Sequence, residues 1–503
     1  MNSTPESSQL PRILGPWMAT ALVIGTVIGS GVFKKASSVA DKIPDFGLAM
    51  TAWVLVGVLA ILGALALAEV AVLLPKAGGN YVFLKEGFGR WAGFLWGWVE
   101  FWIIRSGSIA ALATVFSESL HDILRQTRGG GEDVLSFWAR QGMTITVIAV
   151  LALVNARGTR WGGGLQIVVT TVKVASLILI ALLPFIVIAV TSEPRTRPSS
   201  HYVTPAWPAD WGGVNWSLFG GGLIGIFWAY HGWMNIAPVA GEVKNPQRNI
   251  PLALFCGVFS IIILYCTVNL AYYLVIPRPE IAALKDRTVA GEFTFRLLGP
   301  IGLVLASTAV MLSVFGSLNG NLLVGPRLLY AMGQDGLAPR ALARLHPRFL
   351  TPALAEAVLA GWAVLMVVFA SLMTQFRLPV IDFGFAILDV NLPEGKALFD
   401  VITDFAMFGA LSFETLAVAS LFVFRRRYPL SKVNLPYRCP FFPWLPIVYV
   451  SAMSLVLFNM FATQRTEALI GVGFILVGAL VYGVVFAGRA SGPTTAARQD
   501  EVS

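Results

Sequence analysis

The stretch GTVIGSGVF, residues 25–33, lies inside an apolar segment that is otherwise typical of a membrane-spanning helix. Gly25, Gly29, Ser30 and Gly31 crowd its centre. A glycine in a helix interior costs about 1 kcal/mol relative to alanine. In a bilayer, every backbone group freed by a break also needs a partner. The stretch therefore predicts a spanning helix that is interrupted near mid-membrane, and it raises the question of what the freed groups bind.

The rest of the chain has the composition of a multi-pass membrane protein. Of its 503 residues, 56% are hydrophobic and 13% are charged, whereas an ordinary soluble domain carries about 25% charged residues. Apolar segments of bilayer-spanning length recur throughout. We expect an all-α integral membrane fold with twelve transmembrane helices, at about 14–38, 48–74, 90–116, 141–155, 162–190, 214–240, 250–276, 297–330, 353–375, 398–424, 441–462 and 466–487.

The placement of charge predicts the orientation. The net charge is +9, and the closely spaced basic residues lie in the loops 75–90, 156–161, 241–250, 326–352 and 425–440. All five loops fall on the side of the N-terminus. The positive-inside rule therefore predicts a plasma-membrane protein with both termini in the cytoplasm. The polar N-terminus shows no removable signal peptide.

No sequence feature indicates an enzyme or a nucleic-acid role. The three cysteines, Cys256, Cys266 and Cys439, lie in or beside spans and show no metal-ligand spacing. HExxH and Walker A motifs do not occur. We therefore expect no catalytic residues, no metal and no cofactor, and we expect the lipid bilayer rather than nucleic acid as the surroundings.

A second interrupted segment follows five spans after the first. It reads GGGLIGIFWAYHGWMNIAPVAGE and covers residues 220–242. Paired interruptions at corresponding positions are typical of transporters built from two inverted five-helix repeats, with the binding site at the midplane. The expected parts are a cytoplasmic tail at 1–13, a first repeat at 14–190, an extracellular loop at 191–213, helices 6–9 of the second repeat at 214–397, helix 10 at 398–424, helices 11–12 at 425–487 and a cytoplasmic tail at 488–503.

The two breaks predict complementary chemistry. A break at residues 28–31 creates a half-helix whose free N–H groups and positive dipole end favour an anion, so Ser30 and Gly31 would offer amides to a carboxylate. A break near residues 228–231 frees carbonyls at a negative helix end, which suits an ammonium group. Together they describe a receptor for a zwitterion. The alternative is two close helix-packing contacts, since Gly25 and Gly29 also fit a small-xxx-small motif.

Five motifs then give the chain a family resemblance. They are IGSGVF (28–33), LPKAGGNYVFLKEGFG (74–89), FWAYHGWMNIAPVAGEVKNPQRNIPLAL (227–254), GSLNGNLLVGPRLLYAMGQDGLAPRALARLHPRFLTP (316–352) and FRRRYPLSKVNLPYRCPFFPWLP (424–446). With them the chain resembles the amino acid–polyamine–organocation superfamily, and within it the L-type amino acid transporter family and its bacterial members. The resemblance covers roughly residues 14–487. It implies a leucine-transporter-like fold with broken helices 1 and 6, and Na⁺-independent movement of amino acids, commonly by exchange.

The resemblance also implies which residues bind the substrate. Matching positions in the first interrupted segment, which would hold the carboxylate and help to bind the amine, are Ile28, Ser30 and Gly31. Matching positions in the second are Trp228, Ala229 and His231, of which Trp228 would close over the ligand as a gate.

Two departures from the family pattern matter. His231 stands where many members of the family have glycine, serine or aspartate. We expect it either to orient the unwound segment through a hydrogen bond or to titrate during transport, as its near-neutral reference pKa permits. The loop at 117–140 lacks the cysteine through which animal members join a single-span glycoprotein. No disulfide-linked heavy chain is therefore expected.

Lys173 lies deep within an apolar run, too far from Gly162 for its side chain to reach the interface easily. An ionisable group at such depth is a functional candidate. Its natural partners are carbonyls near residues 25–28 and a hydroxyl of Ser313 or Ser317. The resemblance implies that its ammonium replaces the sodium ion of coupled members of this fold. The alternatives are a structural lysine in a vestibule and a proton carrier.

The combined prediction is an exchanger of neutral L-amino acids that works by alternating access. The alternatives are a proton-coupled symporter, which would use Lys173 or His231, and an amino acid sensor of the same fold that does not transport. Three further charges lie within predicted spans. Glu69 is expected to reach the interface, Arg105 to pack or line a vestibule, and Glu414 to face the pathway or pair structurally.

Overall fold

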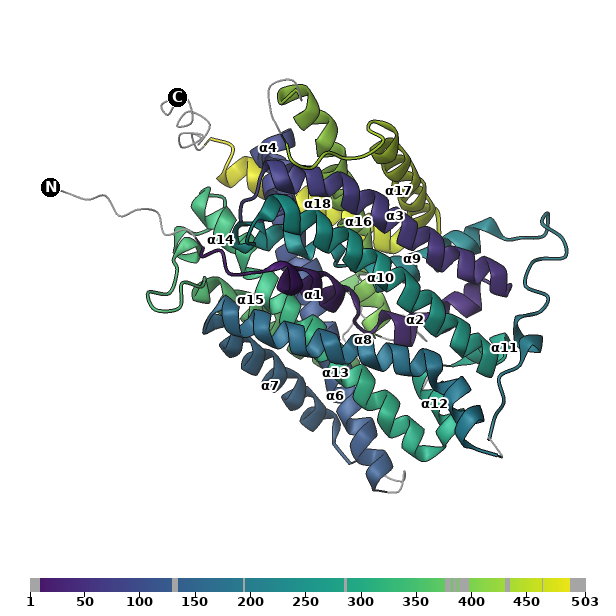
Figure 1. The fold of residues 1–503 in the computed structure, drawn as a ribbon. Coiled ribbons are helices and arrows are strands. Elements are labelled where there is room, and N and C mark those ends of the chain that lie inside the picture. Colours follow the sequence, from purple (N-terminus) through teal and green to yellow (C-terminus); the bar gives the residue numbers. More distant parts are fainter. Residues whose placement is uncertain are drawn as a thin grey trace.

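A computed structural model describes residues 10–128, 134–192, 195–284, 287–375, 381–382, 387–388, 398–429, 435–463 and 465–488. Within these residues the chain is a bundle of helices, with a single antiparallel pair of two-residue strands, β1 and β2 (Figure 1). In chain order the elements are α1 Pro16–Val27, α2 Gly31–Lys42, α3 Phe46–Leu73, α4 Asn80–Phe88, α5 Arg90–Val99, η1 Glu100–Arg105, α6 Ser106–Thr127, α7 Phe137–Ala156, α8 Thr159–Val190, η2 Ser200–Val203, α9 Trp216–Tyr230, η3 Trp233–Glu242, α10 Pro246–Val275, α11 Arg278–Ala283, α12 Val289–Leu298, α13 Pro300–Val324, α14 Pro326–Gln334, η4 Arg340–Ala343, α15 Ala353–Gln375, β1 Ile381–Asp382, β2 Ile387–Leu388, α16 Leu398–Arg427, α17 Trp444–Thr463 and α18 Arg465–Val485.

The spans agree with the predicted all-α membrane fold. Within the described residues, ten helices are long and apolar enough to cross a membrane, and α1 with α2 makes an eleventh candidate, bent by 40°. The predicted span at 214–240 corresponds to α9 and the 3₁₀ segment η3, which are too short and irregular to count by length alone. The total of twelve spans therefore stays a prediction.

Two predicted spans have different limits in the structure. The predicted span at 90–116 continues to Thr127 and contains η1, a π-helical turn. The predicted span at 297–330 is divided, because α12 ends at Leu298 and α14 follows α13. Gly299 separates α12 from α13 with a φ of 70°, a backbone conformation that favours glycine. The sequence pattern did not predict the π-helical turn or these short flanking helices.

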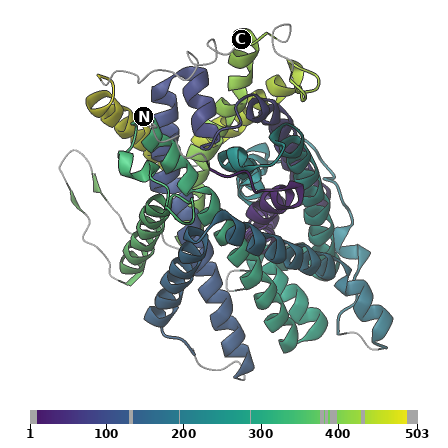
Figure 2. The same ribbon diagram turned by 60° about the vertical axis from the view of Figure 1, so that its left-hand side comes forward.

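The interrupted helices lie inside the bundle. α1 packs against α8, α10, α13 and η3, while α2 packs against α9. A backbone bridge also ties the start of α1 to the end of η3, because the amide of Leu14 donates to Glu242 O at 2.9 Å and the amide of Lys244 donates to Leu14 O at 2.8 Å. The beginning and the end of the described chain lie at the same end of the bundle in both views (Figures 1 and 2).

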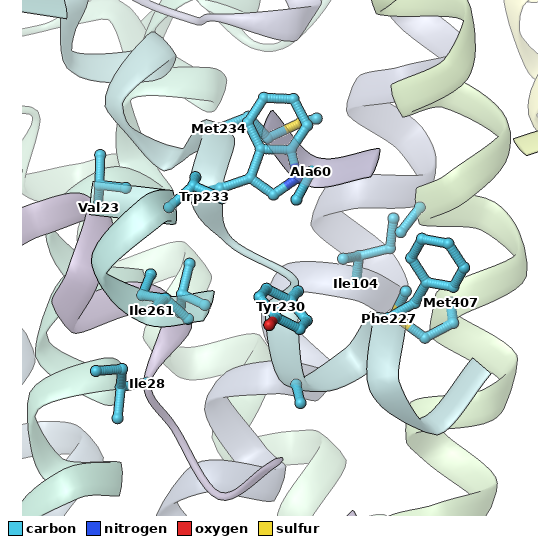
Figure 3. Packing of buried hydrophobic residues seen from close by; sticks show 14 of the residues in the cluster. Val23, Ile28, Ala60, Ile104, Phe227, Tyr230, Trp233, Met234, Ile261 and Met407 are labelled. Atoms are coloured by element: carbon cyan, nitrogen blue, oxygen red, sulfur yellow. The ribbon is translucent and has the colours of Figure 1, made fainter. Parts of the chain in front are cut away.

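Apolar packing surrounds the second interruption. Tyr230 and Trp233 lie on either side of the irregular turn, with Ala60 of α3 and Ile261 of α10 close by (Figure 3). A Cβ at Gly63 would lie 3.0 Å from the ring of Trp233. Glycine at this position therefore lets α3 and η3 approach closely, as small residues commonly do between membrane helices.

Buried polar clamps hold the helix ends together at the face that carries the termini. Glu242 at the end of η3 accepts from Arg327 Nε at 2.8 Å and from Thr159 Oγ1 at 2.7 Å. Glu69 is 2% exposed and accepts from Arg425 Nη2 and the Cys439 amide, each at 2.6 Å. Glu69 therefore binds partners from α16 and the loop that follows it, and its position at the membrane interface stays a prediction.

Candidate functional site

The first helix break occupies residues 28–30. α1 ends at Val27 and α2 begins at Gly31. Side chains from other helices satisfy the freed carbonyls. The Tyr265 hydroxyl donates to Val27 O at 3.3 Å, and Ser313 Oγ donates to Gly29 O at 3.0 Å. The amides of Ser30 and Gly31 have no hydrogen-bond acceptor within the described residues. This break therefore presents free donors at the positive end of α2.

Lys173 binds the other side of the same break. Its Nζ donates to Gly25 O at 2.7 Å, Ile28 O at 2.6 Å and Ser317 Oγ at 2.9 Å. The side chain is fully buried. A Cβ at Gly316 would lie 2.7 Å from Lys173 Cε, so glycine there makes room for the lysine stem. The three oxygen atoms make the kind of site that holds a cation, and the ammonium fills it.

The predicted partner Ser317 thus contacts Lys173, whereas Ser313 acts one step away. Ser313 Oγ donates to Ile28 O at 3.1 Å and to Gly29 O at 3.0 Å. Ser317 Oγ donates to the same carbonyl of Ile28 at 2.8 Å. Both hydroxyls therefore fix the break from α13, but only one of them touches the lysine.

The second break lies at His231 and Gly232. The helix α9 continues through Tyr230, so the break comes at the end of the predicted range 228–231. Gly232 has a φ of 109°, in the region that favours glycine. The Tyr265 hydroxyl donates to Ala229 O at 2.9 Å, and Thr26 Oγ1 donates to Gly232 O at 3.1 Å. Tyr265 thus binds both breaks, and Thr26 ties α1 directly to the second.

The two breaks touch each other around one cavity. A Cβ at Gly31 would lie 2.5 Å from Ala229 Cα, a distance that only glycine permits. The cavity beside this contact is bounded by both breaks and by α6 and α13, through Thr26, Val27, Gly29, Ser30, Gly31, Ser108, Leu112, Trp228, His231, Gly232, Asn235, Ser317 and Asn321. None of the described residues that line it is a carboxylate.

Four of the six predicted binding residues line this cavity, namely Ser30, Gly31, Trp228 and His231. The side chain of Ile28 instead packs in the apolar core (Figure 3), and its carbonyl serves Lys173. Ala229 contributes its backbone, which meets Gly31. The hydroxyl of Ser30 is buried and has no hydrogen-bond partner within the described residues. A polar atom without a partner beside a cavity is a candidate ligand contact.

His231 is held by a carboxylate that the sequence analysis left unassigned. Its Nε2 lies 2.9 Å from Glu414 Oε1 on α16. The indole of Trp228 stacks parallel to the imidazole, with 6.3 Å between ring centroids. Glu414 is 3% exposed and lines two further cavities that His231 also borders. The break therefore carries an aromatic pair that α16 orients.

Arg105 forms a second buried polar centre next to the cavity. The guanidinium bonds Glu100 of η1, and it donates from Nη1 to Asn321 Oδ1 at 2.5 Å and from Nη2 to Asn235 Oδ1 at 2.9 Å. These contacts join η1, α13 and η3. The sequence singled out Arg105 and Glu414 as intramembrane charges. Apart from Glu100, their partners lie on distant segments of the chain and were not visible in the sequence.

Comparisons with known proteins place the arrangement among amino acid carriers. A sequence profile described as amino acid permease matches residues 14–486. A serine/threonine exchanger of Bacillus subtilis is 30% identical, over 95% of this chain and 97% of its own length. The human cystine/glutamate transporter is 27% identical, over 94% of this chain and 84% of its own length. The Asc-type amino acid transporter 1 of Mus musculus is 31% identical, over 72% of this chain and 66% of its own length.

Proposed function

This chain belongs to the amino acid permease family, and from that premise we propose that it exchanges neutral L-amino acids across the plasma membrane without Na⁺. It is a multi-pass membrane transporter of the L-type branch of the amino acid–polyamine–organocation superfamily, and not an enzyme. The observation that carries the proposal is the contact of two helix breaks around one polar cavity. Free amides lie on one side of that cavity and a helix C-terminus on the other.

The zwitterionic head group binds across the two breaks. The substrate carboxylate accepts hydrogen bonds from the amides of Ser30 and Gly31, at the positive end of α2. The ammonium group lies toward the carbonyls at the end of α9, near Trp228 and Ala229, with Ile28 completing the first break. Trp228 closes over the ligand as the gate. Because the lining residues include no carboxylate, a neutral side chain fits better than a cationic one.

Lys173 gives a physical reason for independence from sodium. Its ammonium occupies the oxygen site made by Gly25, Ile28 and Ser317, so a sodium ion has no position there. Ser313 and Ser317 hold the same carbonyls and fix the joint around this charge. Substrate exchange then proceeds with α1–α2 and α9–η3 tilting against the remaining helices.

The orientation and the quaternary state complete the proposal. Both termini lie in the cytoplasm, following the distribution of basic loops. The chain works without a disulfide-linked heavy chain, because residues 117–140 contain no cysteine. One relative, a large neutral amino acids transporter of Homo sapiens that is 31% identical, is named a small subunit. The proposal that this chain works without a disulfide-linked heavy chain therefore distinguishes it from a relative that is named as part of a larger assembly.

A second candidate is proton-coupled symport, which the buried His231–Glu414 pair favours. Purified protein in liposomes distinguishes the two mechanisms. We expect uptake of labelled amino acid only into vesicles preloaded with unlabelled amino acid, at equal rates in Na⁺ and choline media. Uptake into empty vesicles driven by a pH gradient would establish symport instead. Binding without any flux would indicate a sensor.

The variant Gly31→Ala tests the site itself. The added Cβ would lie 2.5 Å from Ala229 Cα, so the breaks could no longer meet. We expect exchange to fall at least about tenfold, because the head-group contacts depend on that approach. The matched control is Gly361→Ala on α15, where nothing lies within 4 Å of the added Cβ. Equal exchange rates in the two variants would contradict the assignment.

A further inference from the structure

The proposed head-group contacts do not use the side chains of His231 and Glu414. His231 lies at the second break, between α9 and η3, and Glu414 comes from α16. Their side chains are 15% and 4% exposed. Within the described residues, the His231 ring is the one side chain that contacts the Glu414 carboxylate at hydrogen-bonding distance. A buried carboxylate is costly unless it is paired, so this contact fixes the imidazole in the wall of the substrate cavity.

The pairing determines what the imidazole offers to a ligand. An ionised carboxylate only accepts hydrogen bonds, so Nε2 of His231 carries a proton toward Glu414. In the neutral imidazole, the other ring nitrogen, Nδ1, is then a hydrogen-bond acceptor. A carboxylate that holds one nitrogen of a histidine commonly fixes the tautomer of the ring in this way. With a neutral imidazole, the pair therefore presents an acceptor, backed by a negative charge, rather than a second donor.

Arg105 fixes the opposite polarity on neighbouring groups. It donates to Oδ1 of both Asn235 and Asn321. The Asn321 amide nitrogen donates to Ser317 O at 2.8 Å, whereas no acceptor for the Asn235 amide nitrogen is found within the described residues. Asn235 therefore offers a donor where His231 offers an acceptor, and both residues line the same cavity.

We propose that His231, positioned by Glu414, is a side-chain subsite that selects small neutral amino acids carrying a hydroxyl group. This inference rests on the proposed function. A hydroxyl both donates and accepts, so it can donate to His231 and accept from Asn235 at once. A methyl group in the same place leaves both groups unpaired in a buried site. Sites built to bond a substrate hydroxyl reject the apolar isostere for this reason.

The decisive measurement compares isosteric substrates in the wild-type protein. Threonine and valine differ by a hydroxyl in place of a methyl, and serine and alanine by the presence of the hydroxyl. We expect the transport efficiency, kcat/KM in proteoliposome exchange, to favour the hydroxyl amino acid about tenfold or more in each pair. Equal efficiencies, or a preference for valine, lysine or leucine, would overturn the inference while leaving amino acid exchange intact. Absence of all amino acid flux would instead refute the proposed function.

Two variants separate selectivity from structural support. His231→Phe keeps an aromatic ring against Trp228 but removes the acceptor, so we expect the threonine-to-valine ratio to fall to near parity. Glu414→Gln no longer enforces the tautomer, because an amide also donates, and we expect the ratio to drop several-fold. Glu356→Gln is the matched control, since Glu356 is an equally buried carboxylate that is not among the cavity residues. We expect the control to keep the wild-type ratio.

Ratios within one preparation do not depend on the amount of folded protein. If a variant transports too slowly, competition of threonine and valine for labelled serine binding in detergent gives the corresponding ratio of binding affinities. An unchanged ratio in both His231→Phe and Glu414→Gln would show that the pair only supports the fold and would overturn the proposal.

Discussion

Lys173 is the residue on which the first break depends most directly. Three oxygen atoms surround its ammonium, and two of them are carbonyls of the interrupted segment. Lys173→Ala removes the cation and leaves these carbonyls with only the serine hydroxyls as donors. Hydrogen bonds to charged groups contribute about 1.5–3 kcal/mol each. We therefore expect exchange to fall more than about tenfold, because the break no longer holds the geometry that presents Ser30 and Gly31.

The readout for Lys173→Ala is exchange per folded molecule, with folding checked by gel filtration in detergent. Lys76→Ala provides the comparison, since Lys76 is exposed in the loop before α4. We expect near wild-type exchange from that control. Wild-type rates in Lys173→Ala as well would rule out the cation-replacement role.

At the residue scale, the sequence predicted what local chemistry determines. Glycine at positions 29 and 31 and a deep lysine at 173 are visible in the sequence without any partner. The contact between His231 and Glu414 was not predictable, because it joins the break after α9 to α16, and only tertiary packing brings these together. Arg105 shows the same limit. Its charge was noted, but its bonds to Asn235 and Asn321 require η3 and α13 to be in place.

Among the elements, η3, α8 and α14 meet at one buried clamp. Glu242 and Arg327 are fully buried and joined at 2.8 Å, and Arg327 Nη2 also donates to Thr159 Oγ1 at 2.7 Å. Removing one member of a buried ion pair leaves an uncompensated charge, which costs about 3–5 kcal/mol. We expect Glu242→Gln to lower the free energy of unfolding by about 3 kcal/mol. This value is at the lower end of the range because the glutamine amide oxygen still accepts one hydrogen bond. Unfolding by SDS titration in mixed micelles measures this change.

A partly exposed ion pair provides the control for that clamp. Glu292 bonds Arg296 on α12 at 2.9 Å, and both side chains are partly exposed. Pairs of this kind contribute about 1 kcal/mol or less. Glu292→Gln is therefore expected to change the free energy of unfolding by no more than that. A Glu242→Gln variant as stable as this control would mean that the clamp does not hold η3 to its neighbours.

Helix breaks were predictable and the π-helical turn was not, for a physical reason. The breaks at residues 28–30 and at Gly232 coincide with glycine, whose backbone freedom is a property of the residue itself. The turn Glu100–Arg105 consists of ordinary helix-compatible residues. It places Arg105 against Glu100, Asn235 and Asn321, and therefore depends on contacts from other elements.

For the whole molecule, the sequence predicted the class of fold and most of the spans. Long apolar runs bounded by basic loops are enough to locate α3, α8, α10, α15 and α17 to within a few residues. The short helices α4, α11, α12 and α14 were not predicted, because segments of this length give no apolar run long enough to span a bilayer. The inverted five-helix repeats stay a prediction that the two central breaks support.

Orientation is the prediction that belongs to the molecule as a whole. The opposite face carries cations too, but several are neutralised there. Lys34 bonds Glu118 at 3.1 Å, and Arg296 bonds Glu280 and Glu292. Arg340, Arg344 and Arg348 on the face of the termini have no ion pair within the described residues. Within the described residues Arg195 and Arg197 in the opposite loop also have no ion pair, so the prediction rests on the number and close spacing of basic residues in the loops on the face of the termini. The positive-inside rule places that face in the cytoplasm.

Protease sites added at either end of the chain test this orientation in a bacterial host. We expect both sites to be protected in intact spheroplasts and cleaved in inverted membrane vesicles. A site inserted at residues 207–213, in the loop between α8 and α9, should show the opposite pattern. Cleavage of terminal sites in spheroplasts would place the termini outside. It would then also reverse the faces from which Trp228 and the Glu242–Arg327 clamp are reached during exchange.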